Sequence, residues 1–215
     1  MNTFVDSGLV LSLPLPELDG GSVRSRDAGG HPCTVTGASW RPDGYSFDGI
    51  GDCIDAGNPA ALRLTGCHTV AAWVRPVLGA DGTVCGKDAG TAGQRGWNLV
   101  VMADGRVRQV VSSDGTSIAY ATTVDAVPEG EWTFLAGTYD RTALRIYRDG
   151  EEVPVSLTGS VPGGQFDCAG NVRIGRRNDG NVVYAGGIAG VLVLNRAWAA
   201  AELQRHYLAT KWRYR

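Results

Sequence analysis

The sequence predicts an all-β fold, a two-sheet antiparallel jelly-roll sandwich with one short C-terminal helix. Side chains alternate between two faces through Trp132–Tyr139 and again through Leu144–Tyr147, and a period of two is the pattern of a strand. Asp149-Gly150 ends the second run with a dipeptide that readily forms tight hairpins. Helix formers dominate in Ala199–Leu208, so a helix is expected there.

Gly-rich and Pro-Asp-Gly turns divide the N-terminal part of the chain into short strands. An apolar run comes first, a polar loop follows over residues 17–30, and three more short runs come after the loop. We expect strands here at Gly8–Leu15, Cys33–Thr36, Tyr45–Phe47 and Asp52–Ala56.

The middle of the chain is rich in β-branched and aromatic residues. Pro76 ends the first of these runs, because proline has no N–H for a strand ladder. Ala103-Asp104-Gly105 joins two later runs as a hairpin. The expected strands are Thr69–Val74, Gly82–Cys85, Trp97–Met102, Arg106–Val111, Ile118–Thr123, Trp132–Tyr139 and Leu144–Tyr147.

The C-terminal part supplies the last strands and the helix. Asn171–Gly175 is expected as a short strand, and the continuous apolar run Gly187–Leu194 as a strand buried on both faces. Leu203, Tyr207 and Leu208 form the helix face expected to pack on the sandwich. Because no linker divides the chain, we expect one domain over residues 1–209 and a C-terminal tail over 210–215.

Composition narrows the class of protein. With 43% hydrophobic and 20% charged residues over 215 positions, the chain has the composition of an ordered globular domain. The net charge of −2 argues against nucleic acid as the main partner, because phosphate binding requires a concentrated basic face. No apolar run approaches the roughly 20 residues that span a bilayer, so we expect no membrane insertion. Asp6 before the apolar run at 8–15, with Pro14 and Pro16 at its end, is unlike a signal peptide.

The five cysteines form no Cys-x-x-Cys pair and no metal-like spacing with the histidines. Because their number is odd, at least one thiol is free. Most lie in strand-like runs, where cysteine behaves as a small buried hydrophobe. We expect reduced, structural cysteines, with Cys33 and Cys53 as the first pair to test for a bridge.

Six blocks covering nearly the whole chain carry a family resemblance: Gly8 to Leu15, Phe47-Asp48-Gly49-Ile50-Gly51-Asp52, Thr69 to Pro76, Gly130-Glu131-Trp132 with Gly137-Thr138-Tyr139-Asp140, Ile174-Gly175-Arg176, and Val193-Leu194-Asn195-Arg196-Ala197. In them the chain resembles the laminin-G-like, concanavalin A-like lectin/glucanase group. The resemblance implies a jelly roll that serves as an adhesive or glycan-binding module of secreted enzymes, surface proteins or virus particles.

Several members of this group bind calcium at the sandwich rim, and the resemblance leaves Asp48 and Asp52 as candidate ligands. Ala185 and Ala189 stand where the family commonly has acidic or amide residues. A calcium ion needs about 6–8 oxygen ligands, so these two positions weigh against a site. The alternative is that the two aspartates stabilise their turn.

Catalytic members of the superfamily carry Glu-x-Asp-x-x-Glu on one strand, where alternation brings the carboxylates to one face. Glu17-Leu18-Asp19 begins that pattern, but Ser22 stands at its last position. Neither a Gly-x-Ser-x-Gly motif nor a triad spacing is present. We therefore expect no enzymatic activity, with a glycoside hydrolase as the less favoured alternative.

Carbohydrate recognition needs a flat aromatic face for a sugar ring and polar side chains for its hydroxyls. For the tryptophans, packing in the core is the alternative role. The candidate glycan-binding residues at the sandwich rim are Trp40, Trp97, Asn178, Asp179, Asn181 and Tyr184.

The tail alternates cationic and aromatic residues, the types that anchor interfaces. They are Lys211, Trp212, Arg213, Tyr214 and Arg215. Together with the missing export signal, this tail predicts a virion surface component, such as a decoration, tail or fibre protein of a bacterial virus, within a homo-oligomer or larger assembly. A frayed terminus is the alternative for the tail, and a lectin-like, glycan-binding accessory protein at an extracellular surface is the alternative function.

Overall fold

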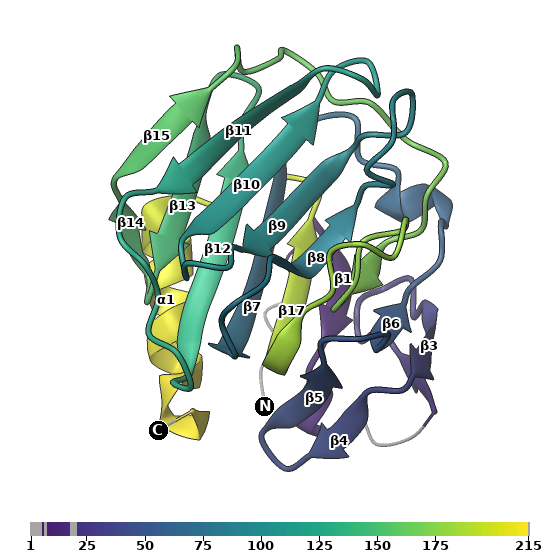
Figure 1. Ribbon diagram of the computed structural model, residues 1–215, viewed down its shortest axis with the longest axis vertical. Coiled ribbons are helices and arrows are strands. Elements are labelled where there is room, and N and C mark those ends of the chain that lie inside the picture. Colours follow the sequence, from purple (N-terminus) through teal and green to yellow (C-terminus); the bar gives the residue numbers. More distant parts are fainter. Residues whose placement is uncertain (1–5, 7, 18–20, 215) are drawn as a thin grey trace.

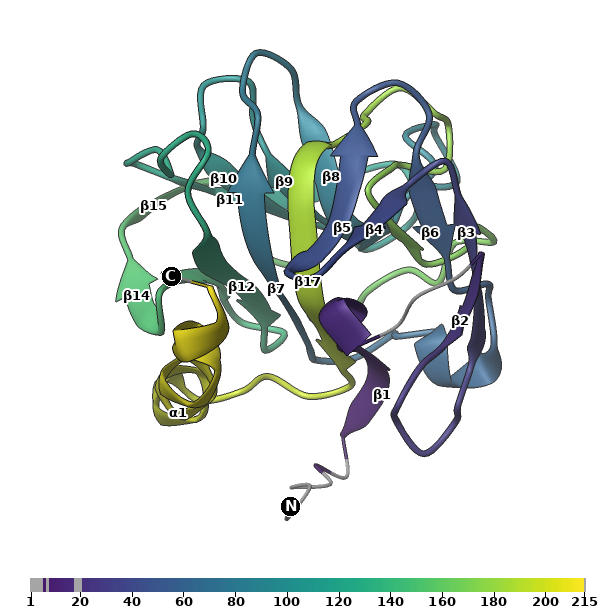
Figure 2. The same ribbon diagram turned by 90° about the horizontal axis from the view of Figure 1, so that it is seen from below.

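The computed structural model describes residues 6, 8–17 and 21–214, which form two antiparallel sheets stacked face to face (Figure 1). Helix α1 (Ala200–Thr210) lies against the outer side of one sheet (Figure 2). Three short 3-10 helices complete the described chain: Leu15–Glu17, Ala60–Leu62 and Lys211–Arg213. No helix in this part of the chain has the length and hydrophobicity that crossing a membrane requires.

The sheet next to the helix has eight strands, and its long central strand pairs with two different neighbours on one side. The first half of β17 pairs with β5, and its second half pairs with β1, after a bulge between Ala189 and Leu192. In spatial order the strands are β14 (Glu151–Val153), β13 (Leu144–Arg148), β12 (Thr133–Tyr139), β7 (His68–Pro76), β17 (Ala185–Leu194), β5 (Gly44–Asp48) and β4 (Ser39–Arg41), with β1 (Leu9–Leu13) beside β17.

The second sheet has nine strands and faces the viewer in Figure 1. Its order is β15 (Val155–Thr158), β11 (Ile118–Thr123), β10 (Val107–Ser112), β9 (Trp97–Val101), β8 (Gly82–Lys87), β16 (Arg173–Ile174), β6 (Cys53–Asp55), β3 (Pro32–Thr36) and β2 (Ser22–Arg24).

The predicted fold class is therefore confirmed: the protein is an antiparallel sandwich, mostly strand, with a C-terminal helix. Four short strands were not predicted from the sequence, namely β2, β4, β14 and β15. Each lies at or beside a sheet edge and is largely exposed, so it carries no alternating buried pattern. Their place in the fold depends on pairing with a neighbour rather than on their own side chains.

Apolar residues on the facing sides of both sheets form the main core, with Leu11, Val70 and Ile146 among those fully buried. A second cluster, which we name the outer aromatic cluster, covers the other face of the eight-stranded sheet. It consists of Ala71, Trp73, Phe134, Ala136, Tyr147, Ala189, Leu203 and Tyr214. The central strands β7, β12 and β17 are thus buried on both faces, as predicted for β17.

The helix packs through two of its three predicted residues. Leu203 is fully buried, and Tyr207 stacks on Trp73 with ring centroids 5.7 Å apart. Leu208 was wrongly assigned to this face, since its side chain is 52% exposed. Five residues along a helix turn the side chain by about 140° from Leu203, which points it to solvent.

All five cysteines are free thiols in the structure. Cys53 stands opposite Thr36 in the β3–β6 ladder, so Cys33 is three residues away along its strand and on the opposite face. A separation of about 10 Å along the strand exceeds the Cα distance that a disulfide spans. Cys33 is buried instead, and burial raises the pKa of its thiol to about 11.

His68 gives the fold a testable pH dependence. It is fully buried at the start of β7, where its Nε2 lies 2.8 Å from the Gln109 side-chain nitrogen, and burial lowers its pKa to about 3. The unfolded chain takes up this proton near pH 6.5, whereas the folded state does not. Stability from His68 is therefore present above pH 6.5 and lost as pH falls towards 3.

We expect the free energy of unfolding to fall between pH 6.5 and 4.5, by up to about 1.4 kcal/mol per pH unit for His68. Half-buried His206, whose pKa is lowered to about 4, adds a loss of the same sign. Urea unfolding of the wild type and of His68→Gln across this range tests the expectation. The plot of the free energy of unfolding against pH should have a shallower slope in the variant, whatever the variant's absolute stability. An unchanged slope would contradict a buried, neutral His68.

Candidate functional site

The outer face of the nine-stranded sheet carries a continuous row of side chains from different strands. Trp97, Leu99 and Val101 of β9 point into the core, so Asn98 and Val100 point outward. The registers of β8–β11 place the residues opposite Asn98 and Val100, and those opposite them in turn, on the same outer face. We name the resulting surface the outer trough; its residues are Thr83, Gly86, Asn98, Val100, Arg108, Val110, Tyr120 and Thr122.

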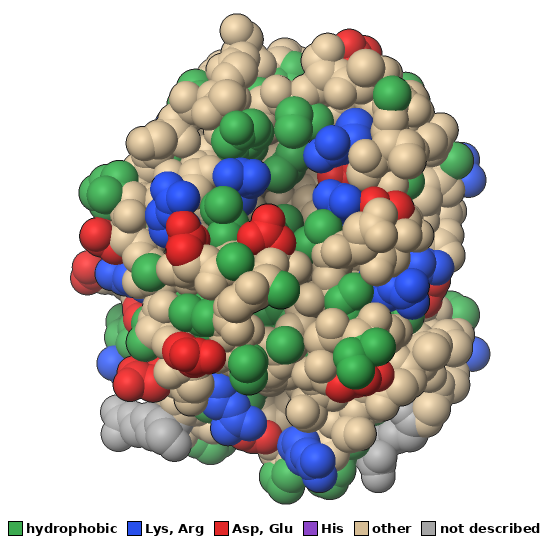
Figure 3. Space-filling view, viewed as in Figure 1, with side chains coloured by type: hydrophobic (Ala, Val, Ile, Leu, Met, Phe, Trp, Pro, Cys, Tyr) green, Lys and Arg blue, Asp and Glu red, His purple; other side chains and the backbone are tan. Residues whose placement is uncertain are grey.

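Figure 3 shows this face hollowed in the middle, with hydrophobic side chains inside the hollow and both basic and acidic side chains around it. The floor is closely packed: Asn98 is 2% exposed, and its Nδ2 donates to Thr83 Oγ1 over 3.1 Å. Its Oδ1 has no hydrogen-bond partner within the described residues and lies over the bare backbone of Gly86. A Cβ at Gly86 would come within 2.3 Å of that oxygen, so the glycine makes room for the amide.

Arg108 and Tyr120 are the half-buried side chains that rise from this floor. The Arg108 guanidinium lies 4.4 Å from the centroid of the Tyr120 ring, and its Nε donates to Thr122 Oγ1 at 3.1 Å. Stacking and the hydrogen bond together hold the guanidinium in one orientation.

Two loops close one end of the trough, where β8 ends and β9 begins. Residues 88–96 connect these strands. Residues 176–183 pack on that connection, where the backbone N–H of Asn178 donates to the backbone carbonyl of Asp88 at 3.1 Å. Arg177 and Asp179 form a two-point ion pair with distances of 2.9 and 2.7 Å. Burial opposes ionisation of Asp179, but the bonds from Arg177 and Asn181 outweigh it and hold its pKa at about 2.

The row continues from Gly86 through β16 and β6. Arg173 stands opposite Gly86 on one side and Asp55 on the other. Asp55 accepts from Arg173 Nε at 2.9 Å and from Asn171 Nδ2 at 2.9 and 3.1 Å. This carboxylate is therefore fully engaged by its neighbours.

The structure brings three of the six predicted glycan-binding residues together. Asn178, Asp179 and Asn181 share the loop that closes the trough, although their side chains bond mainly within the protein. Trp40 is 37% exposed but lies on β4, at the edge of the other sheet.

Trp97 and Tyr184 were wrong as sugar-stacking residues. Each is 1% exposed, and the Tyr184 hydroxyl donates to the Gly187 carbonyl at 3.2 Å. Both rings belong to the main core, so neither face is open to a ligand. For Trp97 the alternative of core packing is the one observed.

Asp48 and Asp52 stabilise the turn between β5 and β6. Asp48 Oδ1 accepts from the amides of Ile50 and Gly51, at 2.8 and 3.2 Å, and these bonds lower its pKa. Asp52 Oδ2 accepts from the Asp48 amide at 2.9 Å, while burial raises the pKa of Asp52. Within residues 6, 8–17 and 21–214, no group of three or more His, Cys, Asp or Glu side chains is placed to hold a metal ion.

The predicted interface tail is partly docked on the protein itself. Tyr214 is 9% exposed and stacks on Trp73 with ring centroids 4.4 Å apart. Trp212 is 63% exposed, and the Arg213 guanidinium lies 5.0 Å from its ring. Lys211 lies over the Tyr207 ring, and Arg215 is outside the described residues.

Arg108, Tyr120 and Asn98 were missed by sequence reasoning. The sequence did contain an indication of them, because each is a polar residue that alternates with core residues along a predicted strand and so points outward. Strand order and register were needed to place them side by side.

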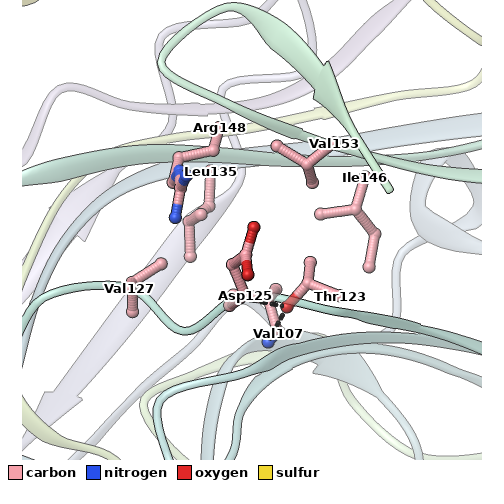
Figure 4. Close-up of a pocket in the computed structure, with 8 residues that line it drawn as sticks. All are labelled: Val107, Thr123, Asp125, Val127, Leu135, Ile146, Arg148 and Val153. Carbon is pink, nitrogen blue, oxygen red and sulfur yellow. Dashed lines mark hydrogen bonds between the residues drawn. The ribbon is translucent and has the colours of Figure 1, made fainter. Parts of the chain in front are cut away.

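A cavity between the two sheets is too small to be an alternative site. Figure 4 shows a cavity lined by residues of both sheets, among them Val107, Leu135 and Ile146, with Asp125 and Arg148 also lining it. Its volume of about 10 Å³ holds roughly one water molecule. Sugar-sized ligands occupy pockets of about 300 Å³ or more.

Comparison with known proteins agrees with this architecture. A family model described as the concanavalin A-like lectin/glucanases superfamily matches residues 47–204, well over half of the chain. The chain belongs to this superfamily. No curated protein sequence gave a match.

Several solved structures resemble the fold of this chain at low sequence identity. The binding domain of Paraclostridial Mosquitocidal Protein 1 has a TM-score of 0.69 and 13% identity, covering 94% of this chain and 52% of that one. A botulinum neurotoxin serotype D ligand-binding domain, solved with N-acetylneuraminic acid, has a TM-score of 0.72 and 11% identity, with coverage of 96% and 52%. Trypanosoma rangeli sialidase has a TM-score of 0.70 and 15% identity, with coverage of 97% and 34%.

The chain thus spans about half of the toxin domains and a third of the sialidase. At these identities the likeness concerns the fold. Most of the neighbours described are binding domains, and one is an enzyme.

The two tail aromatics should differ in their effect on stability. Tyr214→Ala removes a buried ring from the outer aromatic cluster and should lower the free energy of unfolding by about 2–3 kcal/mol. The neighbouring Trp212→Ala is the matched control and should change it by less than about 0.5 kcal/mol, since exposed side chains contribute little. Denaturant unfolding measures both. Equal losses in the two variants would contradict the docked position of Tyr214.

Proposed function

We propose that this protein is a non-catalytic, lectin-like module that binds carbohydrate in the outer trough. The observation that carries the proposal is a hollowed sheet face that combines an aromatic ring, an oriented guanidinium and an apolar floor. Sugar rings bind to such surfaces through their apolar faces, and their hydroxyls bond to the polar groups. The chain's membership of a lectin/glucanase superfamily supports this role, as does a structural neighbour that was solved in complex with N-acetylneuraminic acid.

The chemistry of the trough favours binding over hydrolysis. Retaining glycosidases place two carboxyl groups about 5–5.5 Å apart, and inverting enzymes place them somewhat further apart. None of the eight outer-trough residues is Asp or Glu. The nearest carboxylate in the row, Asp55, is engaged by Arg173 and Asn171.

A glycan array followed by calorimetry tests the proposal. We expect binding of at least one glycan class, no release of reducing ends, and at least fivefold weaker binding by Tyr120→Ala, which removes the trough's aromatic ring. Trp40→Ala is the discriminating variant, because it removes an exposed aromatic from the other sheet. Loss of binding in Trp40→Ala with retention in Tyr120→Ala would place the site at β4 instead, and an array without hits would refute the proposal.

The finer part of the proposal is a place on a virion or another extracellular surface, within a homo-oligomer or larger assembly. The exposed Trp212 and Arg213, with half-buried Lys211 beside them, support it, since such residues anchor interfaces. We expect light scattering to find an oligomer whose mass falls in Trp212→Ala. A monomeric wild-type protein would contradict self-assembly, and neighbouring genes for capsid or portal proteins would support the virion.

A further inference from the structure

The arginines that border the outer trough differ in whether a carboxylate neutralises them. Arg173 pairs with Asp55, Arg177 with Asp179, and Arg95 with Asp88, at distances of 2.9, 2.7 and 3.1 Å. Arg106, next to the first residue of β10, pairs with Asp104 at 2.7 Å. These four guanidinium groups have their charge partners within the protein.

Arg108 has no such partner: no carboxylate of the described residues lies within 4.0 Å of it. Its Nε is used by Thr122, and one face of the guanidinium rests on Tyr120. The terminal N–H groups make no hydrogen bond with the rest of the described chain and remain available as a planar, two-donor fork. Such a fork matches the two oxygens of a carboxylate, or of a sulfate, in a bidentate pair.

The residues around Arg108 suit a sugar that carries this anion. Val100 and Val110 form the apolar floor beside it, and the Tyr120 hydroxyl makes no bond to another described residue. An apolar ring face, a hydroxyl and an anionic group would therefore find complementary partners within one patch. Because the whole chain carries a net charge of −2, general attraction of polyanions does not account for such binding.

We propose that the ligand of the outer trough is an acidic glycan, recognised by a bidentate pair between the Arg108 guanidinium and an anionic group of the sugar. The inference rests on the proposed carbohydrate-binding function and adds the ligand class and the residue that selects it. The anion replaces water on a guanidinium that is already oriented, so little side-chain entropy is lost on binding.

Oligosaccharides that differ only in their charged groups test whether the protein selects an acidic glycan. Calorimetry would compare a uronic acid oligosaccharide, the same oligosaccharide with its carboxyl groups reduced to alcohols, and a sulfated oligosaccharide of similar length. We expect the wild-type protein to bind the acidic probe at least tenfold more tightly than its reduced form, with affinity falling as salt rises. The sulfated arm identifies which anion the fork prefers.

Three variants distinguish the role of the Arg108 side chain from a general effect of losing a positive charge. Arg108→Gln should remove the preference for the acidic probe, and Arg108→Lys should restore only part of it, because lysine keeps the charge without the planar fork. Arg75→Gln is the matched control, since Arg75 also lies over an aromatic ring, Trp132, but on the other sheet. It should bind all probes like the wild type, and unchanged thermal midpoints would exclude unfolding as the cause.

The outcomes distinguish this inference from the function on which it rests. Equal binding of the acidic and reduced probes, or a preference that survives Arg108→Gln, would overturn the inference and leave carbohydrate binding intact. Absence of binding to every oligosaccharide would overturn both. Equal losses in Arg75→Gln and Arg108→Gln would also count against Arg108 as the selecting residue.

Discussion

Burial of the central strands of the eight-stranded sheet on both faces limits which surface of this protein is free to bind a ligand. One face of that sheet closes the main core, and the outer aromatic cluster covers part of the other face together with α1 and Tyr214. No helix of the described chain packs on the outer face of β8–β11, which is a hollow with a closely packed floor (Figures 1 and 3). Its half-buried side chains, Arg108 and Tyr120, remain partly open to solvent. For the proposed function the helix therefore matters indirectly, because it covers part of the competing face.

In the outer trough and the segments that border it, polar groups divide into those that hold the structure and those that are open. Asp55, Asp88 and Asp179 are each bound by an arginine, which fixes the loops around the trough and leaves their charges neutralised. The open groups are those of Arg108 and Tyr120: the Arg108 guanidinium lies over the Tyr120 ring, and only its Nε is used, by Thr122. A surface of this kind can discriminate ligands by hydrogen bonding and charge, yet it lacks the carboxylate pair that glycoside hydrolysis needs.

Sequence reasoning recovered the strands whose side chains are buried in an alternating or continuous pattern, together with the helix. It failed for β2, β4, β14 and β15, because an exposed edge strand is held by its neighbour's hydrogen bonds and needs no apolar pattern. At the site, aromatic residue type suggested Trp97 and Tyr184, but both rings serve the core. The loop residues Asn178, Asp179 and Asn181 lie together because they are close in sequence, and their role in glycan binding stays a prediction.

The sequence by itself determined the fold class, the boundaries of the buried strands and the superfamily, because hydrophobic periodicity and turn residues are local properties. Only the tertiary structure decided which aromatic residues face the core and which arginines are neutralised. It also decided that Asn98, Arg108 and Tyr120 share one surface. Those facts depend on strand order and register, which arise from contacts between residues distant in sequence and leave no local pattern.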